Sequence, residues 1–364
     1  MNFVIMHESV VEYDAIGRDI IEMYNILDRR HRCYLYAEHL IGIAEKKRIV
    51  RSELDLLISQ PSTAIVYHLS NYWKEGEDIL ERAVGPIVIK YHNITPPSCF
   101  KFHEPYWRAC LQGREQTLRY FYKFPRAHWL ADSAFNFTEL GLGDAAGRTA
   151  VLPPFPTMTQ SRGAQPYGAL LRSLVESTEL NILFSGRIVP NKGHKLLVRV
   201  LSEYVKRYGR NVRLNIVGKL DSTCQSYYDA VQAAIAAAGL ADLISFLGSL
   251  TDSDLLAYYL GSDAYLCCSD HEGFCVPIVE SQYCRLPVVA KAKAAIPETV
   301  GPGGLLFGED PVPYAIALHR LHTDDGFRQN VVRAGYANYS LRFNQPGIEA
   351  SFRREILKAT GAEL

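Results

Sequence analysis

The chain has 364 residues, of which 48% are hydrophobic, and its 39 basic residues balance 39 acidic ones. This length allows two domains with a core each, and the zero formal net charge argues against nucleic acid as a partner. The 8 cysteines show no repeated C-x-x-C spacing, so we expect core thiols in a reducing compartment rather than a cysteine-bound metal.

Short apolar runs alternate with helical patterns in the first part of the chain. We expect strands near 3–6, 33–36, 64–69, 87–92, 128–131 and 149–152, and helices near 17–29 and 43–58. Residues 1–6 are too short for a signal peptide, and no apolar run reaches the length of a membrane span. The pattern predicts a parallel sheet covered on both faces, in a cytoplasmic protein.

The expected helix over 43–58 is amphipathic and has a cationic flank. Its basic residues are Lys46, Lys47, Arg48 and Arg51. Such a helix can lie on anionic lipid, which would make the protein peripheral at the inner membrane face. The alternative is a solvated face balanced by the nearby acids Glu45, Glu53 and Asp55.

A histidine ends one of the expected strands. His92 follows the run 87–91, and two prolines at 96 and 97 force an extended loop after it. A histidine at a strand's carboxyl end can face a ligand crevice, where it could hydrogen-bond a substrate hydroxyl; the alternative is a ring bonded to the loop backbone. His68, at the end of the preceding strand, is a weaker candidate. Aromatic and arginine residues at 100–124 suggest an acceptor surface, although such spacing is also typical of a core.

A second αβ alternation begins after a proline- and glycine-containing stretch. We expect a linker over 156–178 and strands near 181–186, 212–217, 243–247, 264–268 and 286–290. A final helix is expected near 347–359. The chain should therefore contain two doubly wound sheets, and such sheets bind ligands at the carboxyl ends of their strands.

The first loop of this second part carries two cations. Asn181 to Leu197 reads as a strand, a loop with two glycines and a helix start, and the loop contains Arg187 and Lys192. A fork-shaped donor and a point charge beside a helix amino terminus suit a diphosphate, although cationic loops are also common on solvated turns.

A later strand-turn-helix segment carries two carboxylates. Glu272 lies in the loop after the strand 264–268, and Glu280 lies about one turn into the following helix, so both can reach one crevice. Gly273 lets backbone amides approach a ligand, and Pro277 suits a first helical position. Carboxylates for polyol hydroxyls beside amides for phosphate would fit a sugar nucleotide; the alternative is one capping acid and one solvated acid.

Together, the two segments resemble the nucleotide-sugar domain of retaining glycosyltransferases of family four, which have the GT-B fold. The matching residues are Gly186, Arg187, Lys192, Glu272, Gly273, Phe274, Pro277 and Glu280. Departures from the family pattern are Cys275, where glycine is usual, Ser281 and Arg285. The run Tyr91 to Pro96 resembles the subset that adds a sugar, often mannose, to a polyprenyl-diphosphate-linked oligosaccharide.

The resemblance implies an α/β, GT-B chain with two doubly wound Rossmann-like domains facing a cleft. We expect an acceptor-side domain over 1–155, the linker 156–178, a donor domain over 179–345, and a last segment, 346–364, that crosses back to the first domain. Residues expected to take part in catalysis are His92, Arg187, Lys192 and Glu272. Residues expected to bind the donor are Gly17, Gly186, Arg187, Lys192, Gly218, Leu247, Glu272, Gly273, Phe274, Cys275, Val276 and Glu280.

The expected activity is transfer of a hexose, with mannose from GDP-mannose as the first choice, to a glycan or polyprenyl-linked acceptor in polysaccharide biosynthesis. No metal or cofactor is expected, because the two cations can neutralise the diphosphate. The alternatives are a UDP-sugar donor, a nucleotide-sugar epimerase or hydrolase on the same scaffold, and an inactive subunit that binds a sugar nucleotide.

Overall fold

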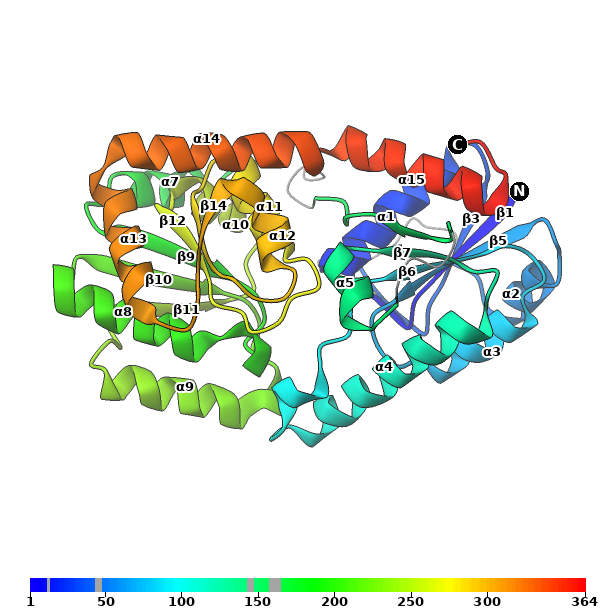
Figure 1. Cartoon of the computed structure of the whole chain (residues 1–364), viewed down its shortest axis with the longest axis horizontal. Helices are drawn as coiled ribbons and strands as arrows, with labels where there is room; N and C mark the ends of the chain where they lie inside the picture. Colours follow the sequence, from blue (N-terminus) through cyan, green and yellow to red (C-terminus); the bar gives the residue numbers. More distant parts are fainter. Residues whose placement is uncertain (12–13, 43–47, 143–146, 157–164) are drawn as a thin grey trace. The chain divides into compact units, whose positions relative to one another are not determined.

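A computed structural model describes residues 1–11, 14–42, 48–142, 147–156 and 165–364 and shows an α/β chain with two compact units (Figure 1). Unit 1 consists of Met1–Pro97, Tyr106–Thr157 and Phe343–Leu364. Unit 2 consists of Ser98–Pro105 and Met158–Arg342. Each unit is built on its own six-stranded parallel sheet.

The sheet of unit 1 has the strand order β3-β1-β5-β6-β7-β8. Its strands are β1 Asn2–Met6, β3 Arg32–Tyr36, β5 Thr63–Leu69, β6 Ile87–Tyr91, β7 His128–Ala131 and β8 Thr149–Val151. The helices of this part are α1 Ala15–Asp28, α2 Arg51–Ile58, α3 Lys74–Arg82, α4 Glu104–Lys123, α5 Ala134–Glu139 and α15 Gln345–Thr360, with the 3-10 turn η1 Pro97–Phe100. Every residue of β5 is buried, as expected of a central parallel strand covered on both faces.

The sheet of unit 2 has the order β11-β10-β9-β12-β13-β14. Its strands are β9 Leu180–Ser185, β10 Val212–Val217, β11 Ile244–Gly248, β12 Ala264–Cys267, β13 Val288–Lys291 and β14 Gly304–Phe307. The helices are α7 Gly168–Val175, α8 His194–Tyr208, α9 Gln225–Ala237, α10 Asp252–Gly261, α11 Val276–Tyr283, α12 Ile296–Val300, α13 Pro311–Thr323 and α14 Asp325–Arg342, with 3-10 turns η2 Pro190–Lys192, η3 Ser222–Cys224 and η4 Gly301–Gly303.

Alternating side chains of the central strands supply two cores in unit 2. Ile182 and Phe184 of β9 pack into the cluster that includes α8, α9 and α13, whereas Leu183 packs into the cluster that includes α10, α11 and α12. The doubly wound α/β architecture expected from the sequence is thereby confirmed.

Several elements differ from the expectation. The short parallel pair β2 Ser9–Val11 and β4 His39–Ile41, and the edge strand β14, were not predicted. Their three or four residues show little alternation for a periodic pattern, although β8 and β12, which are equally short, were predicted. The segment 156–178 was expected to be a linker, but it contains helix α7, which packs on α10.

The basic helix expected over 43–58 has different bounds. Residues 43–47 lie outside the described part of the chain, residues 48–50 are not helical, and α2 begins only at Arg51. The Arg51 guanidinium contacts three carboxylates, those of Asp55, Glu75 and Asp78. This cation is therefore neutralised within unit 1. Over the described ranges, none of the helices combines the length and the apolar character needed to cross a membrane.

The last helix belongs to unit 1. Figure 1 shows α15 in red beside α1 in blue, and Ile348, Phe352 and Ile356 of α15 share a buried cluster with α1 and the sheet. The ring of Phe352 meets Phe155 edge to face, with 6.4 Å between the ring centroids. Glu355 adds a buried contact of 3.0 Å to His128 at the start of β7. The helix therefore completes the core of unit 1.

We predict that Phe352→Ala lowers the free energy of unfolding by about 3–5 kcal/mol, because it removes a fully buried ring and leaves a cavity. Urea unfolding followed by circular dichroism measures the change. Leu357→Ala is the matched control, since Leu357 lies on the same helix and is 44% exposed; it should cost less than about 1 kcal/mol. Equal losses for both variants would show that α15 is not anchored through Phe352.

Candidate functional site

The predicted donor residues of unit 2 follow neighbouring strands at one edge of the sheet. Arg187 and Lys192 follow β9, Gly218 follows β10, Leu247 lies near the end of β11, and Glu272 follows β12. The strand order runs β9, β10, β11 in one direction and then restarts with β12 on the other side of β9. This reversal is a topological switch point, where open α/β sheets bind their ligands.

Backbone hydrogen bonds hold the loops after β9, β10 and β11 close together. The Gly186 amide donates to the Val217 carbonyl at 2.9 Å, and the Gly218 amide donates to the Gly248 carbonyl at 2.8 Å. Gly218 has φ +148°, and a Cβ there would lie 2.0 Å from the Gly186 oxygen. Only glycine therefore fits at position 218, and the close approach fixes the loop that carries Arg187.

The loop after β9 is also bonded to the loop after β12. The Asn191 side-chain amide donates to the His271 carbonyl at 3.1 Å, and the Asn191 carbonyl accepts from the Asp270 amide at 2.7 Å. The turn 269–275 is held from its other side as well, because the Phe274 carbonyl accepts from the Thr299 hydroxyl at 2.6 Å. Both loops therefore have defined positions within unit 2.

Lys192 and Glu272 form an ion pair across this junction. The Lys192 Nζ lies 2.7 Å and 2.9 Å from the two carboxylate oxygens of Glu272. The two side chains are 20% and 10% exposed. Burial lowers the pKa of the Lys192 ammonium, but the charge and hydrogen bond of Glu272 together with Cys275 raise it by more, so the pKa lies above its usual value and Lys192 stays charged. The sequence placed both residues at one site but did not predict that they would pair.

Glu280 is a buried carboxylate on α11. It accepts a hydrogen bond from the Tyr259 hydroxyl at 2.7 Å. Burial and the adjacent Glu280 carboxylate together raise the pKa of Tyr259 well above its usual value, so the hydroxyl keeps its proton and remains a donor. Tyr259 therefore holds the Glu280 side chain in place. The two residues are 21 positions apart, and the sequence pattern did not predict their contact.

Cys275 occupies a strained backbone position immediately before α11. Its φ and ψ are 75° and 69°, a left-handed conformation in which glycine is the usual residue. Its Sγ lies 3.9 Å from the Sγ of Cys267. The helix then begins at Val276, with Pro277 in its first turn. A cysteine therefore adopts the backbone conformation that glycine would otherwise provide.

Gly17 has a packing role in unit 1. A Cβ at this position would lie 1.7 Å from the Val11 carbonyl oxygen, and the Gly17 amide donates to the Asp14 side chain at 2.6 Å as a helix cap. These contacts account for glycine here without a ligand. Its contact with a donor phosphate stays a prediction.

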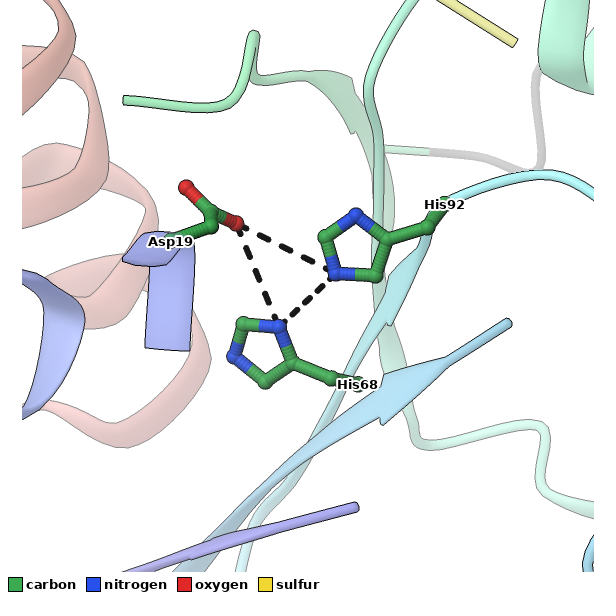
Figure 2. A group of neighbouring side chains, drawn as sticks. All are labelled: Asp19, His68 and His92. Carbon is green, nitrogen blue, oxygen red and sulfur yellow. Dashed lines mark hydrogen bonds and ion pairs between the residues drawn. The ribbon is translucent and has the colours of Figure 1, made fainter. Parts of the chain in front are cut away.

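His92 lies in a closed polar group of unit 1 (Figure 2). Its side chain is 3% exposed, and its Nδ1 and Nε2 lie 3.0 Å from Asp132 Oδ2 and 2.8 Å from His68 Nδ1. Lys90 in turn contacts Asp132 at 2.8 Å. Both ring nitrogens of His92 are thus engaged inside the unit, so its predicted contact with a donor sugar gains no support from this geometry and stays a prediction.

Two members of this group were missed by the sequence analysis. Asp19 is fully buried although it is an acid on the apolar stripe of α1, and Lys90 interrupts the apolar run of β6. A charge within an apolar periodic pattern is the signal that could have identified both. Burial raises the pKa of Asp19, and burial lowers the pKa of His68 well below its usual value, so His68 is neutral near pH 7.

Comparisons with known proteins find similarity to glycosyltransferases over part of the chain. Residues 172–338 match the family described as glycosyl transferases group 1. A D-inositol 3-phosphate glycosyltransferase from Acidothermus cellulolyticus is 32% identical over 169 residues, which is 45% of this chain and 37% of that protein. An O-antigen chain mannosyltransferase B from Escherichia coli is 35% identical over 96 residues, or 26% of this chain and 25% of that protein.

A solved structure extends the likeness to both units. Anabaena HepE in complex with UDP and glucose aligns with 98% of this chain and 100% of its own, with a TM-score of 0.77 and 17% identity. The two curated relatives named above are matched over only 37% and 25% of their own lengths. Residues 172–338 are therefore similar to the group 1 glycosyl transferases, and the chain as a whole has the GT-B fold.

Proposed function

We propose that the chain is a glycosyltransferase that moves a hexose from a nucleoside-diphosphate donor to a hydroxyl of a glycan or lipid-linked acceptor. The observation that carries the proposal is the Lys192–Glu272 ion pair beside Arg187 at the switch point of unit 2. The family match over 172–338 and the UDP-bound structural relative support the same assignment.

The diphosphate would lie against the cations and the first amides of α11. Arg187 is exposed at the end of β9 and offers a planar fork of donors, while Lys192 offers a single charge. When a diphosphate binds, Lys192 exchanges part of its contact with Glu272 for a phosphate oxygen. Glu272 is then released from Lys192 and accepts hydrogen bonds from the sugar hydroxyls. Glu280 accepts hydrogen bonds from the ribose hydroxyls.

The transfer breaks the bond between the anomeric carbon and the phosphate oxygen and forms a bond to the acceptor oxygen. Arg187 and Lys192 stabilise the negative charge that develops on the leaving diphosphate. In our proposal the acceptor hydroxyl attacks from the same face and passes its proton to the leaving phosphate oxygen, so the anomeric configuration is retained. In this proposal Arg187 and Lys192 neutralise the charge of the diphosphate, so no divalent ion is needed there.

GDP-mannose is the first candidate donor, supported by the residues around His92 and by the segment similar to the mannosyltransferase from Escherichia coli. A UDP-hexose is the second, since UDP and glucose occupy the structural relative. For the acceptor, we propose a glycan or a polyprenyl-linked oligosaccharide. Membrane docking through the segment 43–58 gains no support from α2, whose Arg51 is neutralised by acids.

We predict that a nucleoside diphosphate or its sugar derivative raises the melting temperature of the purified chain. A ligand present at 100 times its dissociation constant stabilises the native state by about 2.7 kcal/mol. A thermal-shift panel of guanosine and uridine nucleotides measures the melting temperature with each ligand and shows which base the chain prefers. Nucleoside monophosphates should have much smaller effects, because they lack the second phosphate that the cations would bind; equal effects would contradict the placement of the diphosphate.

We predict that Arg187→Ala lowers kcat by about 10²-fold and weakens donor binding much less, because the guanidinium acts on charge that develops in the transition state. Steady-state assays of acceptor-dependent nucleotide release measure both quantities. Lys195→Ala is the matched control, since Lys195 is an exposed cation in the first turn of α8. This substitution should leave kcat unchanged. Equal losses in kcat and in donor affinity would assign Arg187 to ground-state binding alone.

A further inference from the structure

We infer that Asp19, His68 and His92 form a binding site for a divalent transition-metal ion of the zinc type within unit 1. Figure 2 shows the three side chains converging from α1 and from the carboxyl ends of β5 and β6. The proposal concerns unit 1 alone and does not rest on glycosyl transfer.

The distances between the three potential ligand atoms fit a metal ion. His68 Nδ1 and His92 Nε2 are 2.8 Å apart, and Asp19 Oδ2 lies 3.9 Å from each of them. The point equidistant from these atoms lies about 2.1 Å from all three, which is the usual length of zinc–imidazole and zinc–carboxylate bonds. A tetrahedral ion would part the two nitrogens by roughly half an ångström, and its fourth ligand would be water.

The surroundings orient two of the three ligands, Asp19 and His92, as metal sites require. His92 Nδ1 lies 3.0 Å from Asp132 Oδ2, so a proton on Nδ1 leaves the lone pair of Nε2 directed at the site. Asp19 Oδ1 accepts from the Phe155 amide at 2.9 Å, which turns Oδ2 toward the two rings. His68 would offer Nδ1 with its proton on Nε2, a buried nitrogen that has no hydrogen-bond partner among the described residues. The carboxylate beside His92 is thus the kind of outer partner that fixes a metal-binding tautomer.

The oxygen of Asp19 that points into the site supplies an independent reason for a cation. The Asp19 and His68 side chains are fully buried, and Asp19 Oδ2 has no hydrogen-bond partner among the described residues. An unpaired carboxylate oxygen in a protein interior is costly, and a bound cation removes that cost. The Lys90 ammonium does not hydrogen-bond this oxygen of Asp19, because it contacts Asp132 Oδ1 and the Leu152 carbonyl instead.

The charges nearby also favour a cation. Two carboxyl groups, those of Asp19 and Asp132, lie in this group beside one ammonium, that of Lys90. Imidazole with carboxylate oxygen suits zinc, iron and nickel better than magnesium or calcium.

The first experiment measures bound metal in protein purified without a metal-affinity tag, exposed to Zn²⁺ and then desalted. We expect one zinc ion per chain in the native protein, and loss of that ion in Asp19→Asn and His68→Gln. His128→Gln is the matched control: His128 is a buried histidine of the same unit, paired with Glu355, and this variant should keep the metal. Substoichiometric zinc in the native chain, or full retention in both site variants, would overturn the proposal.

A second measurement keeps the test decisive if the variants do not fold. X-ray absorption at the zinc edge of the native protein should show only nitrogen and oxygen neighbours, at about 2.0–2.1 Å, with the multiple scattering of imidazole. Sulfur neighbours at about 2.3 Å would place the ion at Cys267, Cys275 and Glu272 in unit 2, the other group of potential ligands found in the described ranges, and would refute the site. Nucleotide binding is measured separately, so either proposal can fail alone.

Discussion

The ion pair between Lys192 and Glu272 is the interaction on which the geometry of the candidate site depends. Each side chain is largely removed from water, and a charge in that position is stable only when it has a partner. The pair joins the loop after β9 to the loop after β12, which the strand order brings together at the switch point. The two loops are therefore held to each other through this one contact between charged side chains.

Gly218 helps to position the loop after β9, which carries Lys192 of this ion pair. The loop after β10 touches the carbonyl of Gly186 so closely that no side chain fits between them. Asn191 ties the same region to the turn 269–275 through its amide and its carbonyl. Arg187 and Lys192 are thus presented by a loop whose backbone is bonded on both sides, and preorganised charges of this kind need little rearrangement to stabilise a developing anion.

The two units place different chemistry at the same architectural position. In unit 2 the strand ends carry an exposed arginine and a partly exposed ion pair, which a diphosphate can reach. In unit 1 the ends of β5 and β6 carry histidines that are closed within the fold and bonded to each other and to Asp132. Similar sheets thus place partly exposed charged groups at the strand ends in one case and an internal polar group in the other, which illustrates that the fold by itself does not set the chemistry.

The sequence alone determined the order of strands and helices, the two doubly wound sheets and the pair of loops that carry Arg187 and Glu272. These features are local, because periodicity and turn residues act over a few neighbouring positions. The short strands β2 and β14 were not predicted, although β8 and β12 are equally short and were expected, and α7 was hidden in a segment whose prolines and glycines suggested a linker.

Only the tertiary structure decided which side chains meet. Lys192 and Glu272 are 80 positions apart, and His92 and Asp132 are 40 apart, so their pairing depends on sheet order and not on local pattern. The same holds for Asp19 of α1, which is buried beside two histidines from the ends of β5 and β6. Burial and pairing set the charge state of these groups, and both arise from contacts between segments that are distant in the chain.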